Sequence, residues 1–442
     1  MDTDRLLREL TDFLRIPSIS TLSTHDRDCR RAAEWVAAEL RRLGCTGVEL
    51  LASESHPVVW GVGPEVPGAP TLVIYGHYDV QPPDPLDEWT TPPFEPAVRD
   101  GRLYARGSAD DKGQVFCLLK AIEAGGVPRV NFRFLIEGEE EHGSRVLFDL
   151  LKREPHRVRA DAVLVADMAY FAPGWPAVYS TLRGLCYAEI TVRTSKTDLH
   201  SGEYGGAAPN AHEELCRLLG RLKGPDGKIN IPGLYQAVKP PTRAERAAWR
   251  RLPFKEKAFL DRQVQAKALT GLKTHTVLER LWALPTFEIH GISGGFTGEG
   301  AKTVIPAQAT AKVSLRLVPN QKMKTVERQL EAAVKKLAPK YVDASVTFLH
   351  GADPARMKLS NPVFRKLDQA FREVVGRAPV AARAGGSIPI VPALASAGAP
   401  VVMTGIGLPD DRLHAPNEKL DLQQLWDGIE VFKRFYELLG SD

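Results

Sequence analysis

Acidic and imidazole side chains follow several strand-like runs of this sequence at the points where those runs end. The apolar stretch "TLVIYG" leads into His77 and Asp79. Further runs lead into three consecutive acids, into a single aspartate and into a histidine, and one helical pattern is preceded by two aspartates: Glu139, Glu140, Glu141, Asp167, His414, Asp110 and Asp111. Taken singly, each of these residues is most simply interpreted as a cap or a structural polar group.

Taken together, the same residues favour a metal site. Open α/β sheets usually bind ligands at the carboxyl ends of their strands, so these side chains would meet in one crevice. Carboxylates crowded there would repel one another and raise each other's pKa values, whereas divalent cations make the cluster attractive. Imidazole and carboxylate ligands without thiolate suit Zn²⁺, with Mn²⁺ or Co²⁺ as alternatives. The number of ligands fits two ions better than one.

The elements that must position these residues alternate between helix and strand. Helical patterns are predicted at about 2–15 and 29–43, followed by the strand-like runs "VELLA", "PVVWGV", "TLVIYG", "VNFRFLIEG", "ADAVLVA" and, much later, "APVVMTGIG". The amphipathic patterns "GQVFCLLKAIEAG" and "SRVLFDLLKRE" lie between several of these runs. This order predicts an α/β fold with a mixed, largely parallel sheet sandwiched by helices.

The middle of the chain follows a different order. From about residue 185 it reads as strand, helix, strand, strand, helix, strand, the split β-α-β-β-α-β unit of ferredoxin-like folds. A polar excursion at about 224–285 interrupts this unit and is predicted as a helical hairpin, a loop or both. Because α/β alternation resumes after 355, we expect the unit to be inserted into a discontinuous first domain. The predicted boundaries are 1–184 and 355–442 for the catalytic domain and 185–354 for a lid or dimerisation domain.

Composition narrows the class of protein. The 442 residues carry 58 basic and 54 acidic side chains, a net charge of +4, with no dense basic tract, which argues against a nucleic-acid partner. No apolar run approaches the ~20 residues that span a bilayer, so no membrane association is expected. The N-terminus is predicted as an amphipathic helix without a signal-peptide pattern. Five widely spaced cysteines are expected to be buried free thiols in a soluble, cytoplasmic protein.

Eight ordered motifs carry a resemblance to a known family. They are "GHYDVQP", "GSADDKGQ", "EGEEEHGS", "VADM", "DLHSGEYGG", "SLRLVPN", "GGSIPI" and "LHAPNEKL". Together they resemble the aminoacylase/carnosinase-type family of dinuclear metallopeptidases, and among its members the cytosolic nonspecific dipeptidase, or carnosinase-like, branch. The resemblance runs in order from about residue 5 to 440, across both predicted domains.

The resemblance implies a role for each metal-site residue. His77 and Asp167 would bind one ion, Glu141 and His414 the other, and Asp110 would bridge the two. Asp79 would orient His77 without binding metal, and Glu140 would be the general base. The family pattern also implies a cis peptide bond after Asp110.

Further residues would bind substrate in the resembling family. A planar guanidinium is the best partner for a free carboxylate, and Arg316 fits that role. Gly386 and Ser387 would line the same carboxylate site and Thr303 would lie near it, while His200 would stabilise the oxyanion. Two positions depart from the pattern: His142 stands where many relatives have Ser, and Ala384 replaces an acid that helps hold the substrate's free amine.

These residues predict a metal-dependent hydrolase that cleaves dipeptides or similar small amides with a free C-terminal carboxylate. The alternative with the same chemistry is an N-acyl-amino-acid or succinyl-diaminopimelate deacylase. A third reading is a non-catalytic, metal-stabilised binding protein. The resemblance further implies a homodimer formed through the inserted domain, in which His200 enters the partner's active site.

Overall fold

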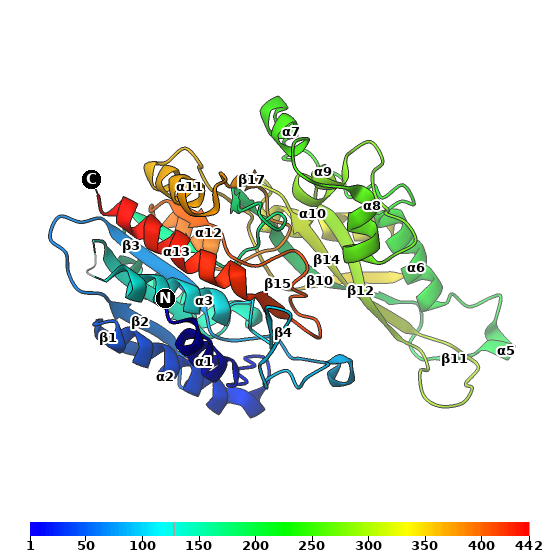
Figure 1. Cartoon of the computed structure of the whole chain (residues 1–442). Coiled ribbons are helices and arrows are strands. Elements are labelled where there is room, and N and C mark those ends of the chain that lie inside the picture. The colour runs from blue at the N-terminus through cyan, green and yellow to red at the C-terminus, as the bar shows by residue number, and fades with distance from the viewer. Residues whose placement is uncertain (127–128, 442) are drawn as a thin grey trace. The chain divides into compact units, whose positions relative to one another are not determined.

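The computed structural model describes residues 1–126 and 129–441 and divides the chain into two compact units (Figure 1). The first unit comprises Met1–Ser180, Met357–Ala382 and Ile388–Asp442, and the second comprises Thr181–Arg356 and Arg383–Ser387. No sequence pattern predicted that the short segment 383–387 belongs with the second unit. No helix among the described residues is both long and apolar enough to cross a membrane.

The first unit is built on a six-stranded mixed sheet. Its spatial order is β1 (Thr46–Leu51), β2 (Val58–Val62), β6 (Asn131–Glu137), β3 (Thr71–His77), β7 (Ala162–Val165) and β18 (Val401–Met403). The pairings from β6 to β18 are parallel, and those involving β1 and β2 are antiparallel. β3 is buried from Leu72 to His77, as its continuous apolar run predicts for a strand covered on both faces.

Helices of the first unit pack against this sheet and against one another. They are α1 (Thr3–Leu14), α2 (Asp26–Arg42), α3 (Lys112–Gly125), α4 (Arg145–Arg153), α11 (Pro362–Val375), α12 (Val391–Ser396) and α13 (Leu422–Leu439). α2 begins at Asp26, earlier than the predicted residue 29. α3 and α13 lie side by side (Figure 1), and their buried residues share one hydrophobic core with β3 and β6.

Short strands complete the first unit. β4 (Ala97–Arg99), β5 (Arg102–Tyr104) and β19 (Lys419–Asp421) form a three-stranded sheet. β8 (Ala177–Tyr179) pairs in parallel with β17 (Val380–Ala382).

The second unit contains the predicted β-α-β-β-α-β order. β10 (Gly184–Arg193), α6 (Ala211–Leu222), β12 (Thr286–Gly294), β14 (Gln308–Leu317), α10 (Met323–Leu337) and β15 (Asp343–Ala352) follow one another in sequence. The antiparallel sheet has the order β12-β14-β10-β15, which is the ferredoxin-like arrangement. Alternate residues of β10 are buried, and they share a core with α6 and α10. The remaining short elements are β9 (Thr181–Leu182), β11 (Leu199–His200), α5 (Ser201–Tyr204), β13 (Val304–Ile305) and β16 (Ala355–Arg356).

The excursion at 224–285 folds into short helices joined by turns. α7 (Arg243–Trp249), α8 (Glu256–Phe259) and α9 (Val277–Trp282) are observed, with a π-helical turn at Leu260–Val264. Capping boxes start two of these helices, because Thr242 pairs with Glu245 and Thr276 with Glu279.

The cysteines are free, as predicted, but they are not all buried. Cys216 is exposed on α6 beside Arg217, and Cys45 is only partly buried. The prediction of burial was wrong for Cys216, since the apolar stripe of α6 is formed by its leucines and leaves this cysteine on the solvent-facing side.

Candidate metal centre

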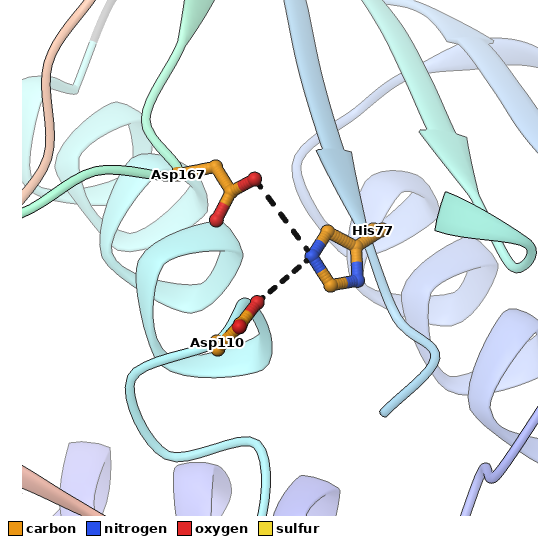
Figure 2. A group of neighbouring side chains, drawn as sticks. All are labelled: His77, Asp110 and Asp167. Atoms are coloured by element: carbon orange, nitrogen blue, oxygen red, sulfur yellow. Dashed lines mark hydrogen bonds and ion pairs between the residues drawn. The ribbon is translucent and has the colours of Figure 1, made fainter. Parts of the chain in front are cut away.

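The sheet of the first unit brings together residues that are far apart in the sequence. β3 ends at His77, with β6 and β7 running parallel on either side of it. The chain after β7 carries Asp167, and Asp110 lies just before the start of α3 (Figure 2). Because parallel strands end at one edge, the predicted ligands gather there.

Two groups of possible ligand atoms share Asp110. Nε2 of His77 lies 3.1 Å from Oδ1 of Asp110 and 4.0 Å from Oδ2 of Asp167 (Figure 2). Nε2 of His414 lies 3.1 Å from Oδ2 of Asp110 and 3.3 Å from Oε1 of Glu141. Within each group the ligand atoms lie within 4.8 Å of one another. The two oxygens of Asp110 therefore face different histidines, as a bridging carboxylate requires.

The charges of this cluster fit divalent cations. Burial and repulsion from Asp110 raise the pKa of Asp167 well above its ordinary value. Contacts with Asp110 and Glu141 raise the pKa of His414 to about 10. The buried carboxylates attract positive charge strongly. The cluster offers nitrogen and oxygen ligands and no thiolate, which is the donor set of a zinc, manganese or cobalt site. The residues present therefore fit the two ions that the sequence pattern implies.

Asp79 connects His77, a candidate ligand, with the turn that carries Glu140 and Glu141. Its Oδ1 lies 3.3 Å from Nδ1 of His77, and its carboxylate accepts the backbone N–H groups of Glu140 at 3.3 Å and Glu141 at 3.1 Å. The hydroxyl of Ser20 donates to Asp79 Oδ2 at 2.7 Å. Asp79 and Ser20 are buried, so these hydrogen bonds are shielded from water. Ser20 was not predicted, since "PSIS" has no periodicity that marks a functional residue.

Glu140 belongs to neither ligand group. The residue is partly exposed. Burial and the charges of Glu141 and Asp167 raise its pKa well above the ordinary value, against the opposing effect of His77. Glu140 therefore interacts electrostatically with both candidate ligand groups although it belongs to neither.

Glu418 holds the loop that precedes Asp111 and was also missed by sequence reasoning. Its buried carboxylate accepts backbone N–H groups from Gly107, Ala109 and Asp110, and it pairs with Arg106. The peptide bond between Asp110 and Asp111 is cis, as the resemblance implied. A buried acid of this kind has no sequence signature of its own, although "LHAPNEKL" contains it.

The predicted substrate residues lie in the second unit, in two groups. His200 on β11 pairs with Val304 on β13, and the N–H of Ser201 donates to the carbonyl of Thr303 at 3.0 Å. Nδ1 of the exposed His200 accepts the N–H of Gly202.

The second group of predicted substrate residues surrounds Arg316, the candidate for binding the substrate carboxylate. Arg316 on β14 donates to Oγ of Ser387 at 3.0 Å, and Gly386 precedes that serine. No hydrogen bond or ion pair within residues 1–126 and 129–441 joins Arg316 to His200. Of the two departures from the family pattern, His142 is exposed and Ala384 is buried.

A carboxylate shared by two histidine-containing ligand groups, at the carboxyl edge of a largely parallel sheet, defines the site of a dinuclear metallohydrolase. The chain belongs to the peptidase family M20/M25/M40, whose model matches residues 73–438.

Curated relatives align with nearly the full length of the chain. It is 33% identical over 458 residues to the Cys-Gly metallodipeptidase dug1 of Schizosaccharomyces pombe, covering 99% of this chain and 96% of the relative. It is 32% identical over 456 residues to the Beta-Ala-His dipeptidase of Homo sapiens, covering 98% and 90%.

Solved structures of peptidases also match the whole chain. The dipeptidase Dug1p from Saccharomyces cerevisiae matches with a TM-score of 0.87 and 28% identity, covering 99% of this chain and 96% of that one. The M20 family metallo-carboxypeptidase Sso-CP2 from Sulfolobus solfataricus matches with a TM-score of 0.86 and 30% identity, covering 100% of both chains. The predicted family, fold class and metallopeptidase class are confirmed.

Proposed function

We propose that this chain is a two-metal dipeptidase that hydrolyses dipeptides or similar small amides with a free C-terminal carboxylate. The observation that carries the proposal is Asp110, whose two carboxylate oxygens each lie 3.1 Å from a different histidine. Relatives named as dipeptidases that cover nearly the whole chain support the substrate class.

The ligand groups divide between two ions. His77 and Asp167 would hold one ion, Glu141 and His414 would hold the other, and Asp110 would contribute to both. The ions, Zn²⁺ in our proposal with Mn²⁺ or Co²⁺ as alternatives, supply Lewis-acid chemistry that lowers the pKa of water and polarises an amide carbonyl.

Protein side chains would move the proton and hold the reacting groups. Glu140 accepts a proton from the attacking water and later delivers it to the leaving amine. Asp79 fixes this glutamate indirectly, because it binds the backbone of the turn that carries Glu140. His200 donates a hydrogen bond to the oxyanion, from the partner subunit of a homodimer formed through the second domain.

The free carboxylate of the substrate would bind to Arg316. This guanidinium is partly buried, contacts Ser387, and has no carboxylate within ion-pair distance among the described residues. An unpaired, partly desolvated guanidinium favours an anionic ligand. Gly386 and Thr303 complete the proposed substrate site.

The runner-up is an N-acyl-amino-acid or succinyl-diaminopimelate deacylase, and one residue favours it. Ala384 is 2% exposed and offers no carboxylate for a substrate amine. We further propose that residues 1–184 and 355–442 form the catalytic domain and 185–354 the lid or dimerisation domain. A cytoplasmic location is part of the proposal, and the free cysteines are consistent with it.

The test is a panel of free dipeptides, their N-acetylated forms and their C-terminal amides, each assayed with Zn²⁺, Mn²⁺ and Co²⁺. We expect free dipeptides to be cleaved fastest and C-terminal amides poorly. Faster cleavage of N-acetylated substrates would establish the runner-up instead. A metal-loaded protein that is inert on the whole panel would favour the non-catalytic reading and end the proposal.

A further inference from the structure

The turn that contacts Arg316 is tied to the start of β10. The hydroxyl of Ser387 donates to the carbonyl of Arg183 at 2.6 Å and accepts from Arg316 at 3.0 Å. The backbone N–H of Arg183 donates to the carbonyl of Gly386 at 3.1 Å. Because a hydroxyl has a single proton, Ser387 uses it on Arg183 and presents its lone pairs to Arg316. The orientation of Arg316 thus depends on the backbone position of Arg183.

The side chain of Arg183 anchors that backbone to the excursion. Its Nη2 donates to the carbonyls of Arg280 at 2.8 Å and Leu284 at 3.1 Å, at the end of α9. Arg183 is 6% exposed and has no ion-pair partner among the described residues. Burial, with repulsion from Arg316, lowers its pKa to about 10, so it remains charged at neutral pH. A buried guanidinium held by carbonyls alone is a costly contact that serves geometry rather than charge neutralisation.

Arg383 anchors the other end of the same turn. It is 7% exposed, pairs with Glu245 on α7 and lies over the ring of Trp249, 5.2 Å from its centroid. Trp249 in turn packs edge-to-face on Trp282 of α9 at 5.1 Å. The contacts close a ring, from the turn through α7 and α9 to Arg183 and back to the turn.

We propose that Arg183 and Arg383 are positioning residues that use α7 and α9 of the excursion to lock the Ser387 turn, and thereby aim Arg316 at the substrate carboxylate. The inference rests on the proposed function and extends it, because it gives the excursion at 224–285 a role in substrate binding. Neither arginine is assigned a contact with the substrate.

The decisive variants are Arg183→Met and Glu245→Gln. Glu245 is partly exposed and its replacement preserves shape, so this variant tests the ring even if Arg183→Met does not fold. We expect Arg183→Met to raise KM for a free-acid dipeptide about tenfold, with kcat nearly unchanged, because uniform binding is lost. Glu245→Gln should raise this KM about threefold. KM for the C-terminal amide should change less than about twofold in both, since it lacks the carboxylate.

Matched controls separate positioning from general damage. Arg193→Met removes an exposed guanidinium from the far end of β10, where it contacts Gln308, and should leave KM unchanged for both the free acid and the amide. Glu213→Gln removes an exposed ion pair with Arg217 and should likewise leave KM unchanged for both substrates. In an Arg316→Ala background, Glu245→Gln should have no further effect, because residues that act through one group are not additive.

The outcomes are distinguishable from those for the function itself. A wild-type protein that cleaves dipeptides without preferring free acids over amides would refute the carboxylate site, whatever the variants do. A wild-type protein with that preference, retained in full by folded Arg183→Met and Glu245→Gln, would overturn the positioning role alone. Equal KM increases on free acid and amide would also overturn it, since that pattern indicates general damage to the site.

Discussion

Replacing Glu418 with glutamine tests whether this residue holds the loop that positions Asp110 in the candidate metal centre. The carboxylate is fully buried and accepts four hydrogen bonds, from Arg106 at 2.7 Å and from the backbone N–H groups of Ala109 at 2.9 Å, Gly107 at 3.0 Å and Asp110 at 3.1 Å. An amide keeps one oxygen, but its NH₂ group would face backbone donors. Glu418→Gln therefore leaves either Nη1 of Arg106 and the N–H of Gly107, or the N–H groups of Ala109 and Asp110, without their acceptor.

The expected loss of stability follows from these contacts. Removing one partner of a buried ion pair costs about 3–5 kcal/mol, because the remaining charge stays buried and unpaired. Arg106 is 1% exposed and cannot reach water without moving the loop. The free energy of unfolding of a domain is about 5–15 kcal/mol. We therefore expect Glu418→Gln to remove a large fraction of the stability of the first unit.

Urea unfolding in the presence of a chelator measures this loss without a metal contribution. The matched control is Glu430→Gln, which removes a surface pair with Lys433 on α13 and should change stability by less than about 0.5 kcal/mol. Because Asp110 belongs to both ligand groups, Glu418→Gln should also lower the content of both ions together. A variant as stable as the control, with two ions per chain, would refute this account of the loop.

Further expectations concern single side chains of the site. Glu140→Ala should lose turnover yet retain about two ions per chain, whereas Glu141→Ala should lose metal, as measured by metal analysis of dialysed protein; equal metal loss would contradict their separate assignments. Arg316→Ala should raise KM for free-acid dipeptides by tenfold or more and affect C-terminal amides little, and equal effects would remove Arg316 from the site. His200→Ala and Glu140→Ala chains, each nearly inactive, should recover about a quarter of wild-type activity after statistical subunit exchange; no recovery in proven heterodimers would place His200 in its own chain's site or outside any site. Ser20→Ala should lower kcat more than metal content, since Ser20 contacts Asp79 and no ligand.

The sequence predicted which side chains gather at the sheet edge, because their position depends on local order. His77 and Asp167 follow parallel strands, and parallel strands end at one edge of the sheet. The ferredoxin-like order was predictable for the same reason, since each element has its own hydrophobic period.

Contacts between distant segments were not predictable in this way. Ser20 reaches Asp79 across 59 positions, and Glu418 reaches Ala109 across 309. Neither has a periodic neighbourhood, and a buried polar residue is indistinguishable from an exposed one until the fold is known. The excursion was ambiguous because its helices are short, and their anchors, Arg183 and Arg383, lie outside it.

The run Glu139, Glu140, Glu141 places three neighbouring carboxylates in different surroundings. Glu140–His142 form a 3₁₀ turn, in which consecutive side chains point about 120° apart. Glu139 is turned toward α4 and accepts the N–H of Val146 at 3.0 Å, while Glu141 faces His414. Glu140 makes neither of these contacts, and its backbone N–H donates to Asp79 at 3.3 Å. Because Asp79 binds the backbone of Glu140 and Glu141 together, the turn sets the separation between the proposed ligand Glu141 and the proposed base Glu140.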